Sequence, residues 1–188
     1  TVFFSGCPLQ CVFCQNHQIS AECYGKEISI KRLAEIFLEL QNQGANNINL
    51  VTGGHFVPQI IQALDMVRRD LKIPVVYNSS GYETVELVEA AARFVDVFLP
   101  DLKYFSAETA QQLAGAPDYF PVAMAAIRAM CQAKGAPVYD ADGLMQSGTL
   151  VRHLILPLRT SESLRILDAI AEELPSGTPV SLMRQYTP

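Results

Sequence analysis

Amphipathic segments of helical period alternate with short apolar runs along the chain. Their apolar residues recur at the i, i+3, i+4, i+7 spacing, which predicts helices with one buried face. Ser29 is a suitable N-cap for the first such helix, which ends near Gly44. Ser106 should cap another helix, and Pro121–Lys134 forms a further one before Gly135. The apolar positions that carry the pattern are Ile30, Leu33, Ala34, Phe37 and Leu38, then Val57, Ile60, Ile61, Leu64 and Val67, and finally Leu164, Leu167, Ile170 and Leu174.

Six short apolar segments between the helices predict β-strands. Because helices separate them, the strands should be parallel, and six βα units predict an α/β fold, a partial (β/α)6 TIM-like barrel. The stretch Val138–Leu150 contains Asp142-Gly143 and is interpreted as a hairpin-like excursion before the fifth strand. Chemistry in such barrels gathers at the carboxyl ends of the strands. The expected strands are Val2–Ser5, Asn47–Val51, Pro74–Asn78, Val95–Leu99, Leu150–Leu156 and Pro179–Met183.

Composition narrows the class of protein. The 188 residues suit one domain, 1–188, and 49% hydrophobic with 18% charged residues is typical of a globular protein. No apolar run approaches the roughly 20 residues that span a bilayer, and no signal-peptide pattern opens the chain, so we expect a cytoplasmic protein without a membrane partner. A net charge of −5 makes nucleic acid an unlikely partner. Because the chain opens in a strand-like run without an initiator Met, we expect the native protein to be longer.

Three of the five cysteines fall within eight residues, directly after the first strand. Cys7, Cys11 and Cys14 have the spacing Cys-x3-Cys-x2-Cys. Three thiolates on one short loop can bind three irons of a 4Fe-4S cubane, which leaves the fourth iron open to an exogenous ligand. An ordinary ferredoxin cluster would need four cysteines.

The cysteines could also form a disulfide framework or a zinc site. An odd number of cysteines in one crowded loop favours a metal site over a disulfide framework. His17 could complete a zinc site, although zinc ligands are usually drawn in two pairs from a longer loop. Cys23 and Cys131 are interpreted as small apolar residues rather than further ligands.

The cysteine segment, with aromatic Phe13 before its last cysteine, resembles the signature of the radical S-adenosylmethionine (SAM) superfamily. Further segments resemble more specifically the pyruvate formate-lyase activating enzyme group and its uncharacterised relatives. The resemblance extends over nearly the whole chain, and the segments that carry it are Gly6-Cys7 to Cys14-Gln-Asn-His-Gln-Ile-Ser20, Val76-Tyr-Asn-Ser-Ser-Gly-Tyr82, Leu99-Pro-Asp-Leu-Lys-Tyr104, Val151-Arg-His-Leu-Ile-Leu-Pro157 and Ser181-Leu-Met-Arg-Gln-Tyr186.

The resemblance implies a reaction and two cofactors. In that family the open iron of the 4Fe-4S cluster binds the amino and carboxylate groups of SAM, and an electron from the reduced cluster cleaves the sulfonium. The products are methionine and a 5′-deoxyadenosyl radical, which abstracts hydrogen from a substrate in a site that must be kept dry. The implied partners are an electron donor such as flavodoxin or ferredoxin, and an unidentified substrate that is either a small molecule or a glycyl radical enzyme.

The resemblance also implies SAM contacts in the first half of the chain. Phe13 lies where the family places an aromatic near the adenine, although it could merely pack, and Asn16 matches a polar position after the cluster. Gly53 and Gly54 follow the second strand, where bare backbone can approach a ligand closely. Many members have Gly-Gly-Glu here, and its carboxylate receives the SAM ammonium. This chain has His55 instead, which leaves that contact to the backbone carbonyls of Thr52 and Gly53. His55 could face the substrate or be an ordinary loop residue.

Further SAM contacts are implied at the ends of the third and fourth strands. Asn78 and Ser80 are suited to polar contacts with SAM, although a helix-capping turn would use the same residue types. Asp101 and Lys103 match the Asp-Leu-Lys of the activating enzymes, whose carboxylate accepts ribose hydroxyls and whose ammonium offsets the methionine carboxylate. The alternative for this pair is a structural salt bridge.

The last two strands supply the remaining candidates. On the fifth strand Arg152 and His153 point in opposite directions, and the resemblance favours Arg152 facing the barrel with His153 under a helix or at the surface. Gln185 and Tyr186 end the sixth strand, where the family often has a polar residue near the ribose.

We therefore expect a radical SAM enzyme that abstracts hydrogen from an unidentified substrate and that could activate a glycyl radical enzyme. The alternative is a non-catalytic iron-sulfur protein for electron transfer or structure. A fourth cluster ligand from the protein, such as Cys23, would favour the alternative.

Overall fold

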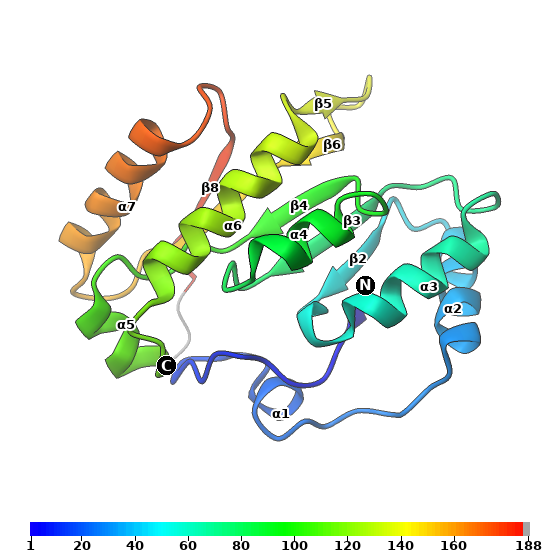
Figure 1. Ribbon diagram of the computed structural model, residues 1–188, viewed down its shortest axis with the longest axis horizontal. Helices are drawn as coiled ribbons and strands as arrows, with labels where there is room; N and C mark the ends of the chain where they lie inside the picture. The colour runs from blue at the N-terminus through cyan, green and yellow to red at the C-terminus, as the bar shows by residue number, and fades with distance from the viewer. Residues whose placement is uncertain (186–188) are drawn as a thin grey trace.

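Parallel strands form the centre of the fold, as the sequence predicts. The computed structural model describes residues 1–185. Its main sheet has the order β1-β2-β3-β4-β6-β5, in which only the β5/β6 pair is antiparallel (Figure 1). A second pair, β7-β8, is parallel. The strands are β1 Val2–Phe3, β2 Ile48–Val51, β3 Val75–Ser79, β4 Val97–Pro100, β5 Val138–Tyr139, β6 Met145–Thr149, β7 Val151–Leu154 and β8 Val180–Met183.

The two sheets meet at the carboxyl end of β4. Leu150 N donates to Phe98 O, Leu102 N donates to Arg152 O at 2.8 Å, and Asp101 and Arg152 form a parallel bridge. At their carboxyl ends the strands therefore follow one another in the order β1-β2-β3-β4-β7-β8. This is the open six-position arrangement of a partial (β/α)6 barrel.

Helices cover the sheet and begin where the sequence predicts. Ser29 Oγ accepts from Arg32 N, and Ser106 Oγ accepts from Thr109 N, so the two predicted N-caps are confirmed. In Figure 1, α6 crosses the sheet and α7 lies beside β8, while α2 and α3 pack together. The helices are α1 His17–Ser20, α2 Ile30–Asn42, the 3-10 turn η1 Gly54–Phe56, α3 Val57–Val67, α4 Val85–Ala91, α5 Ala107–Ala114, α6 Tyr119–Lys134 and α7 Thr160–Glu173.

The buried faces agree with the sequence pattern. Leu33, Ala34 and Phe37 of α2 pack with Ile48 and Leu50 of β2 in one core cluster. A second cluster gathers around α6 and α7, and it includes Ile127, Ile166 and the loop residue Tyr104. The second cluster therefore anchors the segment that follows β4.

The hairpin region is where the strand prediction needs correction. The excursion Val138–Leu150 does form a hairpin, but its second arm, β6, also pairs with β4 in parallel. The expected fifth strand Leu150–Leu156 is therefore the four-residue β7, which continues from β6. Gly148 has a φ of +139°, and a Cβ there would lie 2.9 Å from Pro137 Cα, so this strand position requires glycine. The β5/β6 register also shifts between Val138 and Tyr139, which apolar periodicity does not report.

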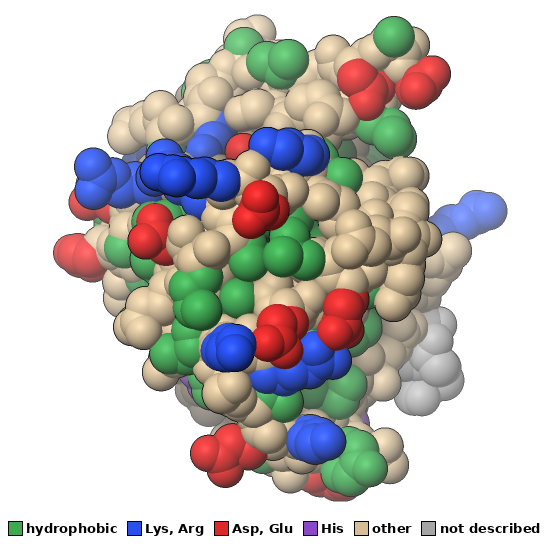
Figure 2. All heavy atoms as spheres, turned by 90° about the vertical axis from the view of Figure 1, so that its right-hand side faces the viewer, with side chains coloured by type: hydrophobic (Ala, Val, Ile, Leu, Met, Phe, Trp, Pro, Cys, Tyr) green, Lys and Arg blue, Asp and Glu red, His purple; other side chains and the backbone are tan. Residues whose placement is uncertain are grey.

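Charges of both signs mix on the face shown in Figure 2, which is the right-hand side of Figure 1, where α2 and α3 lie. On α2, Lys31 and Arg32 pair with Glu35, and Arg32 also pairs with Glu39. Within residues 1–185, no helix is both long and apolar enough to cross a membrane.

Candidate active site

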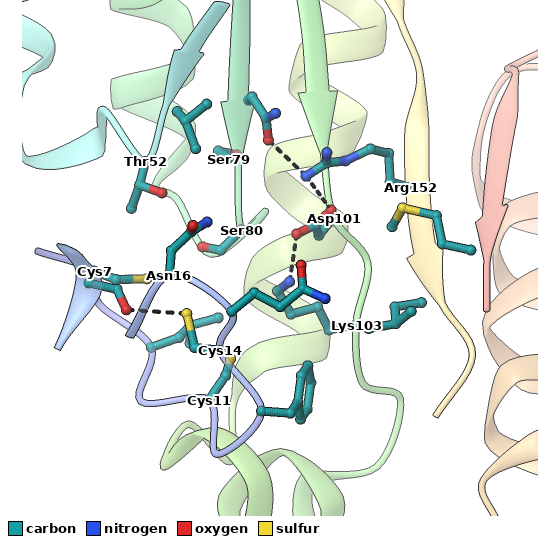
Figure 3. A pocket seen from close by; sticks show the side chains of 18 of the residues that line it. Cys7, Cys11, Cys14, Asn16, Thr52, Ser79, Ser80, Asp101, Lys103 and Arg152 are labelled. Carbon is teal, nitrogen blue, oxygen red and sulfur yellow. Dashed lines mark hydrogen bonds and ion pairs between the residues drawn. The ribbon is translucent and has the colours of Figure 1, made fainter. Parts of the chain in front are cut away.

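A cavity of about 300 Å³ lies at the carboxyl ends of the parallel strands, and the cysteine loop (residues 6–15) runs along it (Figure 3). In Figure 3 the strand arrows point toward the cysteines, so residues far apart in sequence meet there. The sequence-predicted residues that line this cavity are Cys7, Cys11, Phe13, Cys14, Asn16, Asn78, Ser80, Asp101, Lys103, Arg152 and Gln185.

The three cysteine thiols sit in a partly buried, polar setting. Cys14 Sγ lies 3.2 Å from Ser20 Oγ, and the Tyr104 hydroxyl donates to Cys11 Sγ at 3.3 Å. Burial raises the pKa of Cys7 and Cys11, while the nearby Lys103 ammonium acts to lower the pKa of both thiols. Since thiolates are the form that binds metal, Lys103 favours the metal-binding state of the loop.

The donor set fits a cubane better than a single ion. Within the described part of the chain, no three His, Cys, Asp or Glu side chains lie close enough to hold one metal ion. His17, the fourth ligand of the zinc alternative, pairs with Glu22 and is outside the cavity lining. Cys23 is exposed and Cys131 is buried, and neither lines the cavity. The three loop cysteines are therefore the residues that fit a 4Fe-4S cluster with one open iron.

Asp101 lies between two cations on the strand side of the cavity. Its Oδ2 is 2.5 Å from Lys103 Nζ, and its Oδ1 is 2.7 Å from Arg152 Nη2. Arg152 also donates to Asn78 Oδ1 at 2.7 Å, which links β3, β4 and β7 (Figure 3). Although burial opposes the charge of Lys103, the Asp101 carboxylate holds the lysine pKa above its usual value.

Two polar atoms of this network form no hydrogen bond among the described residues. Asp101 Oδ1 and Arg152 Nε are buried and have no hydrogen-bond partner among the described residues, although Oδ1 forms the ion pair with Arg152 Nη2. Buried polar atoms without partners are costly, so a ligand that pairs with them is stabilised. The site is therefore prepared for a polar molecule between β4 and β7.

His153 faces away from the cavity, as its position in the strand predicts. It is 2% exposed, with Nδ1 2.7 Å from Leu102 O and Nε2 2.8 Å from Ser163 Oγ of α7. A carbonyl only accepts, so Nδ1 carries the proton and Nε2 accepts from Ser163. Burial lowers the pKa of His153, which keeps the ring neutral and structural.

The loop after β3 is shaped by Gly81. This glycine has a φ of +79°, and a Cβ here would lie 2.2 Å from Asp101 O. The Tyr119 hydroxyl lies 2.7 Å from Ser80 O and 2.8 Å from Asp101 O, and it accepts from Lys103 N at 3.0 Å. Tyr119 thus ties the loops after β3 and β4 together.

Two predicted site residues do not line the cavity, and their SAM contacts stay a prediction. A Cβ on Gly53 would meet Ile60 at 2.8 Å, and one on Gly54 would meet the Glu83 carboxylate at 2.8 Å. Both glycines therefore have a packing role. His55 is exposed and lies near Gly6, beside the cysteine loop. Tyr186 lies outside the described residues.

The structure adds Glu83, which the sequence pattern did not single out, and it gives the backbone geometry of Thr52, whose carbonyl is a candidate SAM contact. Thr52 lines the cavity with a φ of +58°, which is unusual for a β-branched residue and is typical of functional loops. Glu83 accepts from the Tyr77 hydroxyl at 3.2 Å, and burial raises the pKa of its carboxyl to about 7. A carboxylate thus lies behind the Gly53-Gly54 turn although the residue after the turn is His55. No sequence signal marks Glu83, because only the fold brings it to Gly54.

The sequence matches the model of the family described as the radical SAM superfamily over residues 1–143. It is also 32% identical over 197 residues to the uncharacterized protein MJ0674 of Methanocaldococcus jannaschii, and the match covers 100% of this chain and 53% of that protein. The chain thus spans about half the length of this relative.

Solved structures with the same fold include SuiB of Streptococcus suis bound to S-adenosylmethionine, with a TM-score of 0.66 and 14% identity over 98% of this chain and 40% of SuiB. SuiB bound to its precursor peptide SuiA gives a TM-score of 0.65 and 13% identity over 91% of this chain and 36% of SuiB. Methylornithine synthase, PylB, gives a TM-score of 0.62 and 16% identity over 96% of this chain and 52% of PylB. The predicted fold class is confirmed by these likenesses.

Proposed function

The chain belongs to the radical SAM superfamily, and from that premise we propose that it cleaves SAM reductively at a site-differentiated 4Fe-4S cluster and abstracts hydrogen from a substrate. Family membership implies an enzyme with these two cofactors. The observation that carries the proposal is the single cavity that joins the three-cysteine loop to polar groups at the carboxyl ends of β3, β4 and β7.

In this proposal Cys7, Cys11 and Cys14, which line the cavity, would hold the 4Fe-4S cluster. When bound, the cluster supplies the electron that cleaves the SAM sulfonium. Lys103 offsets the negative charge of the thiolates, an assignment supported by the effect of its ammonium on the pKa of Cys7 and Cys11. Its ammonium is also available to the methionine carboxylate.

The polar groups of the strand ends orient SAM. Asp101 Oδ1, which has an ion pair but no hydrogen bond, and Arg152 Nε, which has no hydrogen-bond partner among the described residues, could pair with ribose hydroxyls and the methionine carboxylate. Asn78, Ser80, Asn16 and Gln185 add donors and acceptors, and Phe13 offers an apolar face to the adenine.

The substrate is a finer part of the proposal. The activating-enzyme motifs favour a glycine of a glycyl radical enzyme as hydrogen donor, and a small molecule is the competing substrate. A reducing compartment such as the cytoplasm suits five free cysteines and a low-potential donor such as flavodoxin or ferredoxin. A glycyl radical signal on a candidate partner, formed only with this protein and SAM, would select the activase.

Anaerobic reconstitution tests the cluster site. Alanine at Cys7, Cys11 or Cys14 should abolish the 4Fe-4S cluster, because three thiolates are the minimum for a site-differentiated cubane. Cys23→Ala and Cys131→Ala are matched controls that should retain full iron content. Adding SAM to the reduced wild-type protein should then alter the electron paramagnetic resonance spectrum of the cluster. A full cluster in Cys11→Ala, or a spectrum indifferent to SAM, would favour the non-catalytic iron-sulfur protein.

A further inference from the structure

Tyr104 lies in the segment after β4 and is fully buried, with 0% of its surface exposed. Its hydroxyl donates to Cys11 Sγ at 3.3 Å, across 93 residues of sequence. Among the described residues this sulfur is the hydroxyl's hydrogen-bond partner. A buried phenol hydroxyl without a hydrogen bond would destabilise the fold. The Cys11 sulfur therefore accounts for a tyrosine at this buried position.

The ring of Tyr104 is held so that the hydroxyl stays aimed at the sulfur. Its edge packs against Tyr119, with ring centroids 5.2 Å apart, and against Phe13 at 6.4 Å. Tyr119 is itself fixed by contacts with the backbone of Ser80, Asp101 and Lys103. The donor is therefore preorganised before any metal binds.

A hydrogen bond to a cluster sulfur acts on the redox equilibrium. A sulfur ligand carries more negative charge when the cluster is reduced by one electron, so a donor to that sulfur stabilises the reduced state more than the oxidised state. Removing the donor should lower the reduction potential of the cluster.

We propose that Tyr104 is a positioning residue that raises the reduction potential of the cluster through its hydrogen bond to Cys11 Sγ. This inference rests on the proposed function, because it needs the cluster on the cysteine loop. It assigns to Tyr104 the task of making the cluster easier for the electron donor to reduce.

Tyr104→Phe removes only the hydroxyl and keeps the ring that packs on Tyr119. At a fixed solution potential, the ratio of reduced to oxidised cluster should fall by on the order of tenfold, which is about 59 mV for a one-electron couple. The readout is a redox titration followed by electron paramagnetic resonance, which reports only the molecules that hold a cluster.

Tyr82→Phe is the matched control. Like Tyr104, Tyr82 packs on the Tyr119 ring, with ring centroids 5.9 Å apart. Its hydroxyl, however, donates to Asp118 rather than to a sulfur. Its potential should equal that of the wild type. Ser20→Ala is a second variant, because Ser20 Oγ lies against Cys14 Sγ, and its potential should also fall.

Three outcomes are distinguishable. A lower potential in Tyr104→Phe with no change in Tyr82→Phe supports the proposal. An unchanged potential in Tyr104→Phe, or an equal drop in Tyr82→Phe, would overturn it. A wild-type protein that takes up no cluster would overturn the proposed function instead.

Discussion

At the scale of single residues, the site is organised around one carboxylate. The Asp101 side chain is only 13% exposed and lies against both Lys103 and Arg152. One carboxylate between two cations leaves a positive balance in the strand-side half of the cavity. That balance suits a site that receives a cluster with thiolate ligands and the carboxylate of SAM.

Asp101→Asn should weaken SAM binding while preserving the fold and cluster content. A lost charge-assisted contact costs about 1.5 to 3 kcal/mol, or roughly 10- to 150-fold in affinity. Calorimetric titration of the cluster-loaded protein measures the effect directly. Asp118→Asn removes a carboxylate that pairs with Tyr82 outside the cavity and should leave the affinity unchanged. Equal affinities in wild type and Asp101→Asn, at matched cluster content, would remove Asp101 from the SAM site.

Residue types and the alternation of side chains along the strands predicted which residues form this site, but not the contacts that these residues make with distant parts of the chain. The cysteine spacing indicated the loop. Alternation along the strand required that only one of Arg152 and His153 face the barrel, and the family resemblance favoured Arg152, which is the residue that lines the cavity. Tyr104 and Glu83 could not be found this way, because their partners, Cys11 and Gly54, are distant in sequence and are brought close only by the fold.

At the scale of elements, the loop between β3 and α4 depends on close backbone approach. Gly81 follows the polar residues Asn78 and Ser80, and because it has no Cβ, Asp101 O can approach its Cα closely. Periodicity finds the strand before this loop and the helix after it, but it does not report how near the next loop lies.

Gly81→Ala should destabilise the fold more than Gly44→Ala. The two glycines have φ values of +79° and +82°, so their backbone strain is matched, but a Cβ on Gly44 meets nothing within 4 Å. Left-handed strain costs about 1 to 2 kcal/mol at either position, and crowding at Asp101 O should add about 1 to 3 kcal/mol at Gly81. Urea unfolding provides the comparison. Equal losses in unfolding free energy would contradict the close approach.

Helices were predicted better than strands for a physical reason. An N-cap and an apolar stripe are local signals, and Ser29 and Ser106 carry both. β6 pairs with both β4 and β5, its Gly148 has a φ of +139°, and the β5/β6 register shifts, none of which local apolar patterning encodes. The short helix α1 buries no residue, so it has no apolar stripe from which it could be predicted.

At the scale of the whole molecule, parallel strand order explains why the site exists. Every parallel strand directs its carboxyl end to the same side, so the loops after β3, β4 and β7 meet the loop that follows β1. The composition predicts a globular protein, and the cysteine spacing predicts an iron-sulfur site. The substrate does not follow from either, because barrel cores of one family serve different substrates.

The measurement that tests the account most directly is the product of SAM under reducing conditions. Wild-type protein with a full 4Fe-4S cluster and a strong one-electron reductant should convert SAM to 5′-deoxyadenosine and methionine in equal amounts, and Cys14→Ala should form neither. Intact SAM recovered from wild-type protein whose cluster is fully loaded and reduced, and which binds SAM, would contradict the account.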